Sequence, residues 1–210
     1  MDNKPKYDPQ KHHRKSIRLK GYDYSQAGAY FITICVKEMK YLYGEIVDEE
    51  MYLNDAGQMI DKWWQKIPEK FPDIELGEYQ IMPNHFHAIV INTGLVATDA
   101  HACPDKQLAD EKPVISNEMH SDENADEHLD EHSGEHMGSP LHSLVQWFKT
   151  MSTNEYIRNV KQNGWPAFNG KLWQRNYYES IIRDEKSFQR IAQYIRNNPA
   201  NWGKDKFFTK

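Results

Sequence analysis

The stretch Met82-Pro83-Asn84-His85-Phe86-His87-Ala88-Ile89-Val90 decides how this sequence is interpreted. Successive side chains of a β-strand point to opposite faces of its sheet, so a strand here places His85 and His87 together on one face, opposite Phe86. Side chains two residues apart on a strand lie roughly 6.5 to 7 Å apart, so both imidazoles can lean onto one bound cation. His85 and His87 are therefore candidate metal ligands. Two of the ten histidines alternating by chance on a half-exposed strand would give the same pattern, so the neighbouring sequence has to decide.

The composition is that of a globular protein, with 39% hydrophobic and 12% aromatic residues in a chain of 210. This length suits one well-buried domain with decorations, and we expect a single domain over residues 1–210. No apolar run approaches the roughly 18 residues of a membrane span, and the polar start of the chain lacks the apolar core of a signal peptide. The two cysteines, Cys35 and Cys103, form neither a disulfide framework nor a Cys-rich zinc site. We expect a cytoplasmic protein with no membrane partner.

Charge is placed very unevenly along the chain, whose net charge is −5. Residues 95–140 hold 12 Asp and Glu against 2 Lys, whereas the rest of the chain holds 24 Lys and Arg against 19 Asp and Glu. Residues 1–20, a basic N-terminal arm, hold 7 basic side chains against 2 acidic, and residues 141–210 hold 12 against 5. Basic segments of this kind favour a polyanionic partner, although ordinary solvated surface charge gives the same pattern.

Local patterns predict the order β-β-α-β-β as far as the His85 strand. The apolar run 29–36 is rich in β-branched and aromatic residues and predicts a central strand. A second strand is expected over 41–47, then a helix capped by Asn54 or Asp55 and stopped by Pro68. The remaining predictions are a strand over 78–82 leading into the His85 strand, an amphipathic helix over 141–160, an extended segment over 172–182 and a final helix that Asp184 opens and Pro199 ends.

The acidic tract over residues 95–139 is predicted to be a low-complexity insertion within the domain, because it is rich in Asp, Glu and His and almost free of aromatic residues. Its residues His128, His132 and His136 are spaced four apart, which on a helix would align three metal ligands. No apolar pattern would hold such a helix, so repeat-like drift in a solvated loop is the preferred interpretation.

The final helix presents a tyrosine and an amide side by side. Its apolar stripe of Phe188, Ile191, Ala192 and Ile195 defines a buried face, and Tyr194 lies on the flank of that stripe. Asn198 follows four residues later and falls on the same flank. Taken alone, the helix favours a different interpretation, in which Tyr194 is a boundary tyrosine that covers the core with its hydroxyl in water.

Three ordered motifs now combine: Met82-Pro83-Asn84-His85-Phe86-His87, Leu172-Trp173-Gln174-Arg175-Asn176-Tyr177-Tyr178-Glu179 and Tyr194-Ile195-Arg196-Asn197-Asn198-Pro199. Together they resemble the single-tyrosine HUH transposases of the insertion-sequence transposase family, and more narrowly the REP-associated tyrosine transposases. The resemblance spans nearly the whole chain except the acidic tract. It implies a ferredoxin-like α+β domain with helices packed on an antiparallel sheet, in which a central strand carries the two histidines.

The same resemblance implies a function and a site. In such proteins the His-hydrophobic-His pair binds Mg²⁺ or Mn²⁺, and a helix tyrosine attacks single-stranded or hairpin DNA. Carried over, His85 and His87 are metal ligands, Tyr194 is the catalytic nucleophile, and Asn198 takes the place of a third, polar ligand. The expected enzyme cleaves and rejoins DNA through a 5′-phosphotyrosine intermediate, which stores the bond energy for rejoining. The resemblance is also compatible with a homodimer.

Basic and aromatic residues near these motifs are the predicted DNA contacts. Cationic side chains bind backbone phosphates and aromatic rings stack on unpaired bases, while each of these residues also has a structural explanation. The candidates are Lys149, Arg175, Arg183, Arg190 and Arg196 for phosphates, and Trp173, Tyr177 and Tyr178 for stacking.

Two other functions are weighed against the transposase. The first is a hairpin-DNA-binding module of the same fold without catalysis, against which the joint presence of His85, His87 and Tyr194 argues. The second is a metallohydrolase that uses the two histidines in another way. That enzyme would need further His or Asp ligands at strand ends, and none is found in the sequence outside the low-complexity tract.

Overall fold

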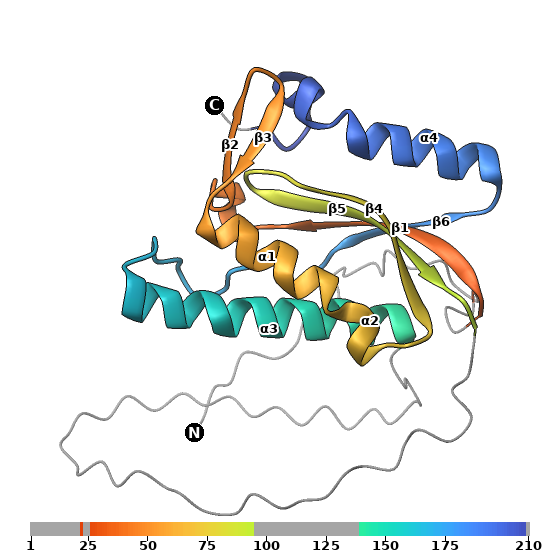
Figure 1. Cartoon of the computed structure of the whole chain (residues 1–210), viewed down its shortest axis with the longest axis horizontal. Coiled ribbons are helices and arrows are strands. Elements are labelled where there is room, and N and C mark those ends of the chain that lie inside the picture. The colour runs from red at the N-terminus through yellow and green to blue at the C-terminus, as the bar shows by residue number, and fades with distance from the viewer. Residues whose placement is uncertain (1–21, 23–25, 95–138, 209–210) are drawn as a thin grey trace, which may run out of the picture. The chain divides into compact units, whose positions relative to one another are not determined.

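A sheet of four antiparallel strands forms the centre of the molecule, in the order β4-β5-β1-β6 (Figure 1). The strands are β1 (Gly28–Cys35), β4 (Ile74–Ile81), β5 (His85–Asn92) and β6 (Tyr178–Ile182). They belong to a computed structural model that describes residues 22, 26–94 and 139–208. Helical crossovers join β1 to β4 and β5 to β6, and this order with these connections is the ferredoxin-like α+β arrangement. The fold class expected from the sequence is confirmed.

Three helices cover one face of the sheet: α1 (Asp55–Gln65), α2 (Ile67–Lys70) and α3 (Pro140–Asn163) (Figure 1). The main apolar core lies beneath them. Trp64 of α1 packs against Phe86 of β5 with ring centroids 4.6 Å apart, and against Phe148 of α3 at 5.4 Å. All three side chains are fully buried. Each such aromatic side chain contributes about 1.5 to 3 kcal/mol through its removal from water.

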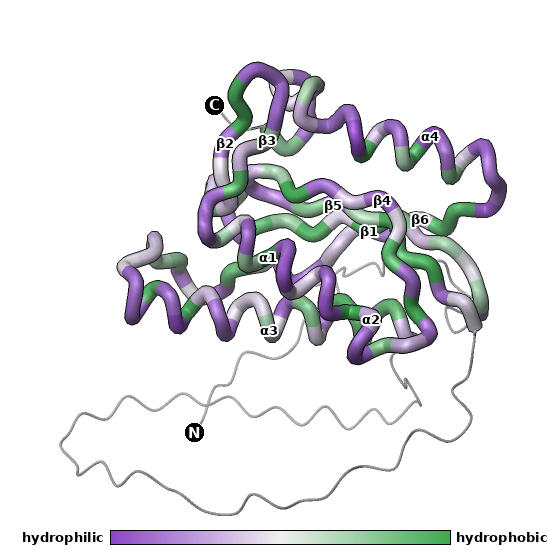
Figure 2. The backbone as a smooth tube through the Cα atoms, viewed as in Figure 1, coloured by the Kyte–Doolittle hydropathy of each residue, from purple (hydrophilic) through white to green (hydrophobic). Residues whose placement is uncertain are grey.

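The opposite face is covered by α4 (Glu185–Arg196) and the short 3₁₀ helix η2 (Pro199–Lys204). The apolar cluster on this face is small, because only one stripe of α4 is apolar. Figure 2 shows hydrophobic and hydrophilic residues alternating along this helix. The buried members of this cluster are Ile89, Ile182, Ala192 and Ile195. This stripe confirms the predicted buried face of the final helix.

The residues predicted to cap two of the helices do so at their first turns. The Asn54 Oδ1 accepts a hydrogen bond from the Gly57 amide at 3.0 Å and so caps α1. The Asp184 carboxylate does the same for α4, accepting from the Ser187 amide at 2.7 Å. Gly164 closes α3 in the left-handed region, with φ +68°. Pro68 does not stop α1, which ends at Gln65, but lies in the first turn of α2.

A hairpin replaces the single strand predicted over 41–47. It consists of β2 (Gly44–Val47) and β3 (Glu50–Leu53), and the 3₁₀ turn η1 (Lys37–Met39) precedes it. Asp48 and Glu49 make the turn with φ of 49° and 67°. Turns with two such residues match the twist of the strands that they join. The extended segment predicted over 172–182 is only partly a strand, because β6 begins at Tyr178.

Some sequence-based expectations fall outside the described residues. The basic arm over 1–20 does so entirely, and so does the acidic insertion over 95–139 apart from Ser139, the N-cap of α3. The histidines at 128, 132 and 136 also lie outside. Among the helices in the described ranges, none combines the length and apolar character needed to cross a membrane.

Candidate metal and tyrosine site

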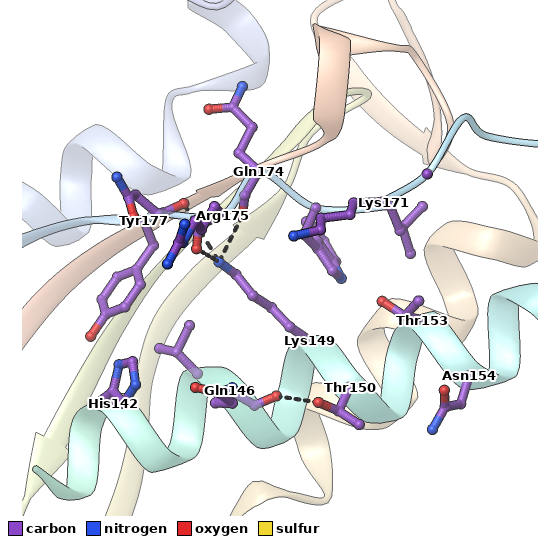
Figure 3. A pocket seen from close by; sticks show the side chains of 15 residues that line it. His142, Gln146, Lys149, Thr150, Thr153, Asn154, Lys171, Gln174, Arg175 and Tyr177 are labelled. Atoms are coloured by element: carbon purple, nitrogen blue, oxygen red, sulfur yellow. Dashed lines mark hydrogen bonds between the residues drawn. The ribbon is translucent and has the colours of Figure 1, made fainter. Parts of the chain in front are cut away.

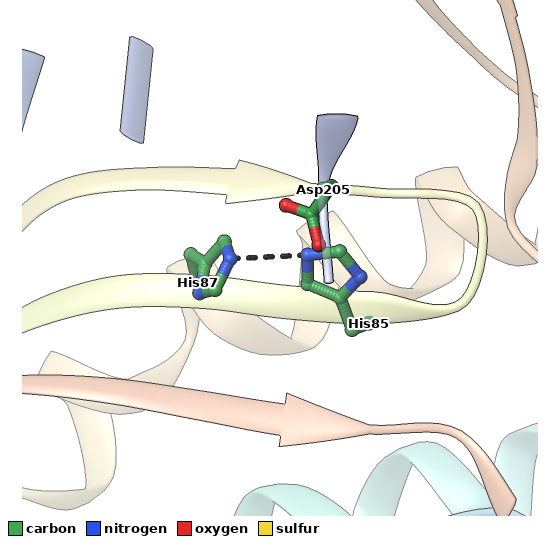
Figure 4. Close-up of side chains that lie close together, drawn as sticks. All are labelled: His85, His87 and Asp205. Atoms are coloured by element: carbon green, nitrogen blue, oxygen red, sulfur yellow. Dashed lines mark hydrogen bonds between the residues drawn. The ribbon is translucent and has the colours of Figure 1, made fainter. Parts of the chain in front are cut away.

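His85 and His87 lie on β5, a central strand, and point toward the α4 side of the sheet. Both side chains are buried, and their Nε2 atoms are 3.0 Å apart (Figure 4). Two ligands at about 2.1 Å from a cation, roughly at right angles, have about that separation. The predicted division of the strand is therefore confirmed: Phe86 enters the main core, while the two imidazoles meet on the opposite face.

Neighbouring side chains orient both rings. The Asn84 Oδ1 lies 2.8 Å from His85 Nδ1, and the Thr33 hydroxyl lies 2.8 Å from His87 Nδ1. The Asn84 amide nitrogen donates to the Phe207 carbonyl at 2.8 Å, which turns the acceptor oxygen toward His85. Because that oxygen only accepts, His85 carries its proton on Nδ1 and keeps a lone pair on Nε2. Partners of this kind hold metal-binding histidines in place.

The environment keeps both histidines neutral. Burial, together with the neighbouring His87 and Lys206, lowers the pKa of His85 to about 2. Burial likewise lowers the pKa of His87 to about 3, again with help from Lys206. A neutral imidazole with a free Nε2 lone pair is the form that binds a cation. The pair is thus in its ligand form throughout the physiological pH range.

Asp205 supplies a carboxylate to the same place. It follows η2, and one ligand atom from each of Asp205, His85 and His87 lies within 4.8 Å of the others (Figure 4). Its position is fixed because Asp205 Oδ1 accepts from the Phe207 amide at 2.7 Å. Two imidazole nitrogens and one carboxylate oxygen are a donor set that divalent metals use. His85, His87 and Asp205 can therefore hold a divalent metal ion.

Tyr194 brings a hydroxyl to the histidine pair. Its Oη lies 3.5 Å from His87 Nε2, and its ring packs edge-on against both His87 and Phe31. The residue is 44% exposed, so the tyrosine next to the ligand atoms also reaches the surface. Burial raises the pKa of this phenol above its ordinary value, Asp205 raises it too, and the Asn198 side chain lowers it. Tyr194 is therefore protonated at neutral pH.

Asn198 lies beside Tyr194, where the helical spacing placed it. Its side chain is buried, and within the part of the chain that the structure describes no hydrogen-bond donor reaches its Oδ1. A buried amide oxygen without a donor carries an energetic cost that a cation or a substrate hydrogen bond would offset. That Asn198 is a metal ligand stays a prediction. The structure adds the carboxylate of Asp205 as another candidate ligand.

Sequence reasoning missed Asp205, Asn84 and Thr33 in their roles. Thr33 lies directly opposite His87 in the pairing of β1 with β5, a register that only the folded sheet reveals. Asn84 stands inside the first motif, and its position next to His85 was the available signal. Asp205 lies beyond the last motif and reaches the site only because the chain turns back after α4.

The predicted DNA contacts are spread over both sides of the sheet. Tyr178 lies on the histidine side, with its ring 6.1 Å from that of Phe207, which in turn lies 4.7 Å from His85. Trp173 is not brought to the surface: it is 4% exposed and its indole N–H donates to the Ser152 hydroxyl at 3.0 Å.

The cationic candidates differ in how available they are. Arg175, Arg183 and Arg190 are exposed. Arg196 pairs with Glu78 at 3.1 Å on the surface. Lys149 is engaged with main-chain carbonyls of the segment that carries the second motif.

Comparison with known proteins gives one close relative. The chain is 36% identical over 206 residues to an uncharacterised protein of Haemophilus influenzae. The aligned region covers 97% of this chain and 97% of that protein. No model of a known protein family matches the chain.

Two solved structures resemble the fold more distantly. A REP-associated tyrosine transposase bound to a REP hairpin is 16% identical, covers 85% of this chain and 70% of that one, and superposes with a TM-score of 0.43. A candidate transposase from Deinococcus radiodurans is also 16% identical and covers 86% and 95%, with a TM-score of 0.39. Scores this low do not carry the ligand or activity of these proteins over to this chain.

Proposed function

This chain belongs to the same family as the uncharacterised Haemophilus influenzae protein. Because that membership does not indicate an activity, we propose a function from the geometry of the site. The function is that of a metal-dependent transposase, which cleaves and rejoins single-stranded DNA next to a hairpin. The observation that carries it is the approach of Tyr194 Oη to within 3.5 Å of His87 Nε2, in a cluster that can hold a divalent cation. A nucleophile and a cation that act on one phosphate have to meet in this way.

The reaction that fits these groups is a transesterification. The Tyr194 oxygen bonds to phosphorus, the bond from phosphorus to the O3′ atom of the preceding nucleotide breaks, and the proton lost by the phenol is balanced by the one gained at O3′. The products are a 5′-phosphotyrosine and a free 3′-hydroxyl, and the reverse reaction with another 3′-hydroxyl rejoins the strand. No ATP is required, because the bond energy is kept in the phosphotyrosine.

A metal bound by His85, His87 and Asp205 would neutralise charge on the non-bridging phosphate oxygens. Mg²⁺ and Mn²⁺ are the proposed ions, and the imidazole nitrogens favour Mn²⁺ of the two, since Mg²⁺ prefers oxygen ligands. The side chain of Asn198 beside Tyr194 suits either a further ligand or a hydrogen bond to the phosphate. Asn84 and Thr33 act through the histidines by fixing their orientation.

Covalent trapping tests this proposal. The purified chain is incubated with Mn²⁺ or Mg²⁺ and a pool of single-stranded DNA hairpins with randomised flanks, labelled with one dye at the 5′ end and another at the 3′ end. A 5′-phosphotyrosine keeps the fragment on the 3′ side of the break, so the 3′ dye should move with the protein on a denaturing gel. The 5′ dye should leave on a shortened fragment.

Tyr194→Phe should abolish the adduct while the protein folds and binds DNA as before. Tyr178→Phe is the matched comparison, because Tyr178 is 49% exposed against 44% for Tyr194 and lies near the same site. That variant should still form the adduct, with its DNA affinity lowered at most. Binding of the pool without any adduct would overturn the enzyme and leave a DNA-binding module of this fold. Release of the 3′ dye with retention of the 5′ dye would overturn the stated polarity.

A further inference from the structure

Lys206 places an ammonium group beside the metal and tyrosine site. It follows the candidate metal ligand Asp205 and precedes Phe207, whose ring lies 4.7 Å from that of His85. The Lys206 Nζ lies 4.6 Å from the centroid of the Phe207 ring and 5.2 Å from that of the Tyr178 ring. Aromatic rings attract ammonium groups at such distances. The two rings therefore hold this cation on the histidine side of the sheet.

Hydrogen bonds fix the backbone that carries Lys206. The Phe208 amide donates to the Asp205 carbonyl at 3.0 Å, which closes a turn around Lys206. The Phe207 carbonyl accepts from the Asn84 side chain at 2.8 Å, and the oxygen of the same side chain orients one of the two histidines. One amide thus ties the turn to the metal ligands, so the start of the Lys206 side chain has a set place relative to the site.

The charge of Lys206 is available to a ligand. Within the part of the chain that the structure describes, no carboxylate forms an ion pair with it, and the residue is exposed. Its charge also acts at the site: burial is the main cause of the low pKa values of His85 and His87, and Lys206 contributes to both. A cation that lacks an acidic partner attracts an anion to the same place.

The proposed reaction calls for positive charge beyond that of a metal ion. A phosphodiester carries one negative charge and gains a second as the Tyr194 oxygen attacks after losing its proton. A divalent ion bound by two neutral imidazoles and the Asp205 carboxylate keeps one of its two positive charges. One negative charge on the reacting phosphate is then left without a partner. The ammonium of Lys206 would balance it.

Three other cations lie in a hollow on the α3 side of the sheet. This hollow has a volume of about 630 Å³ and lies between α3 and residues 170–177 (Figure 3). The Lys149 ammonium donates there to three main-chain carbonyls of this segment. Lys171 and Arg175 line the same hollow. None of the three candidate metal ligands lines it, and neither does Tyr194, so these cations belong to another surface.

The arginines of α4 are the nearer rivals. Arg196 pairs with Glu78 at 3.1 Å on the surface. Arg190 lies one helical turn before Tyr194 and is exposed. Its charge acts at the start of the helix, where hydrogen bonds and, less strongly, Arg190 lower the pKa of Asp184. Arg190 is therefore the alternative to Lys206, and its own variant tests it.

We propose that the ammonium of Lys206 binds a non-bridging oxygen of the phosphate that Tyr194 attacks, which makes Lys206 a catalytic residue; this proposal rests on the proposed function. Lys206 stabilises the negative charge that develops as the Tyr194 oxygen bonds to phosphorus. No proton moves to or from Lys206 in this step, so the bonds and protons exchanged are those of the transesterification. A charged group that is already in place needs no rearrangement when the reaction occurs.

Single-turnover adduct formation at saturating hairpin DNA, with Mn²⁺, tests the assignment. Lys206→Ala should form the Tyr194 adduct about 10²- to 10³-fold more slowly, as on loss of other groups that stabilise developing charge. Its affinity for the DNA should change little, because the contact strengthens only in the transition state. Lys206→Arg keeps the charge and should recover part of the rate. Lys204→Ala removes an exposed lysine two residues earlier and is the matched control. It should keep the full rate, and so should Arg190→Ala.

Substitution in the DNA shows which phosphate Lys206 contacts. A single methylphosphonate replaces one non-bridging oxygen by an uncharged methyl group, at the cleaved linkage or at the linkage on either side. At the cleaved linkage, one of the two stereoisomers should react equally fast with Lys206→Ala and with the unaltered protein, because the oxygen that Lys206 binds is gone. At the neighbouring linkages the defect should remain. A defect that disappears at a neighbouring linkage, or that persists at every position, would overturn the assignment.

Titration with Mn²⁺ in the absence of DNA separates this role from support of the metal ligands. Removal of a cation next to the ligands relieves repulsion, so Lys206→Ala should bind Mn²⁺ at least as tightly as the unaltered protein. Weaker binding of Mn²⁺ would overturn the proposal, since Lys206 would then act through the metal site. The residue is exposed, so the variant should fold. Lys206→Gln, which keeps a polar side chain, replaces it if thermal unfolding shows otherwise.

The role of Lys206 and the proposed function fail in different ways. An unaltered protein that forms the Tyr194 adduct, with a Lys206→Ala protein that forms it equally fast, would overturn the role of Lys206 alone. A loss of rate in Arg190→Ala but not in Lys206→Ala would do the same and assign the contact to Arg190. Absence of any adduct from the unaltered protein would overturn the enzyme, and the role of Lys206 with it.

Discussion

The two faces of the central sheet are built for different purposes, although each strand contributes to both. The face under α1 and α3 is packed with large apolar side chains such as Trp64, Phe86 and Phe148. The face under α4 has a smaller apolar cluster, whose buried members are Ile89, Ile182, Ala192 and Ile195, and next to it lie the buried histidines. Neutral imidazoles and an amide cost free energy when they leave water. A large core on one face allows the other face to keep such groups.

The contrast is sharpest at two neighbouring residues of β5. Phe86 and His87 are adjacent in sequence and equally buried, yet they point to opposite faces. Phe86 contacts Trp64 and Phe148, whereas His87 contacts Thr33, His85 and Tyr194. Substitution at the two positions should therefore separate folding from chemistry.

Phe86→Ala should have the largest effect on stability. Truncation of a buried phenylalanine in a close-packed core lowers the free energy of unfolding by about 3 to 5 kcal/mol. Chemical denaturation measures the change. A His87→Ala protein that loses more stability than Phe86→Ala would contradict the division between the two faces.

Loss of either histidine should remove the activity and spare the fold. His85→Ala and His87→Ala each delete a candidate metal ligand, and we expect cleavage of hairpin DNA to fall by about 10³-fold or more, since a bound cation supplies several kcal/mol at such a site. Binding of the same DNA should persist. Chelation of divalent metal should have the same effect on the unaltered protein, and cleavage that survives both treatments would exclude the site.

Acid should destabilise the metal-free protein through the same face. In the unfolded chain a histidine takes up its proton near pH 6.5, whereas in the fold the pKa values are about 3 for His87 and about 2 for His85. The unfolded state therefore binds more protons between these limits, and stability falls as pH is lowered from about 6.5 to about 3. The slope is at most about 1.4 kcal/mol per pH unit for each histidine.

Urea unfolding across this range, in the presence of chelator, measures the slope. A His85→Gln, His87→Gln double variant is the control, because it removes both titrating groups and keeps polar side chains. Its stability should depend less on pH than that of the unaltered protein. Equal dependence in the two proteins would show that the histidines titrate normally in the fold.

Deletion of residues 98–136 should have the smallest effect. These residues lie outside the described part of the chain, and their sequence offers no apolar stripe for the core on either face. Closing a shorter loop costs less entropy, so the deletion should leave stability unchanged or raise it by about 1 to 2 kcal/mol. Thermal unfolding tests this expectation, and a deletion that unfolds the protein would contradict it.

The sequence predicts most of the frame because its signals are local. The alternation around His85 gives β5 and its two faces, and the capping residues Asn54 and Asp184 mark the starts of α1 and α4. The hairpin of β2 and β3 escapes prediction because Asp48 and Glu49 make its turn with positive φ, where Asn-Gly would have been the recognisable signal.

The site is only partly predictable, because its remaining members meet through tertiary structure. Asp205 is separated from His87 by more than a hundred residues and belongs to a segment with no pattern of its own. Thr33 depends on strand register, which is set by the pairing of β1 with β5. The burial of Trp173 depends on Ser152, a partner on α3 that no local pattern indicates.

Mass spectrometry of the trapped adduct tests the central claim most directly. The protein is incubated with hairpin DNA and Mn²⁺, denatured, and digested with nuclease and protease, after which the modified peptide is sequenced. The account predicts a nucleotide on Tyr194, whose hydroxyl lies 3.5 Å from His87 Nε2. A nucleotide on Tyr177 or Tyr178, or an adduct that still forms in Tyr194→Phe, would contradict it.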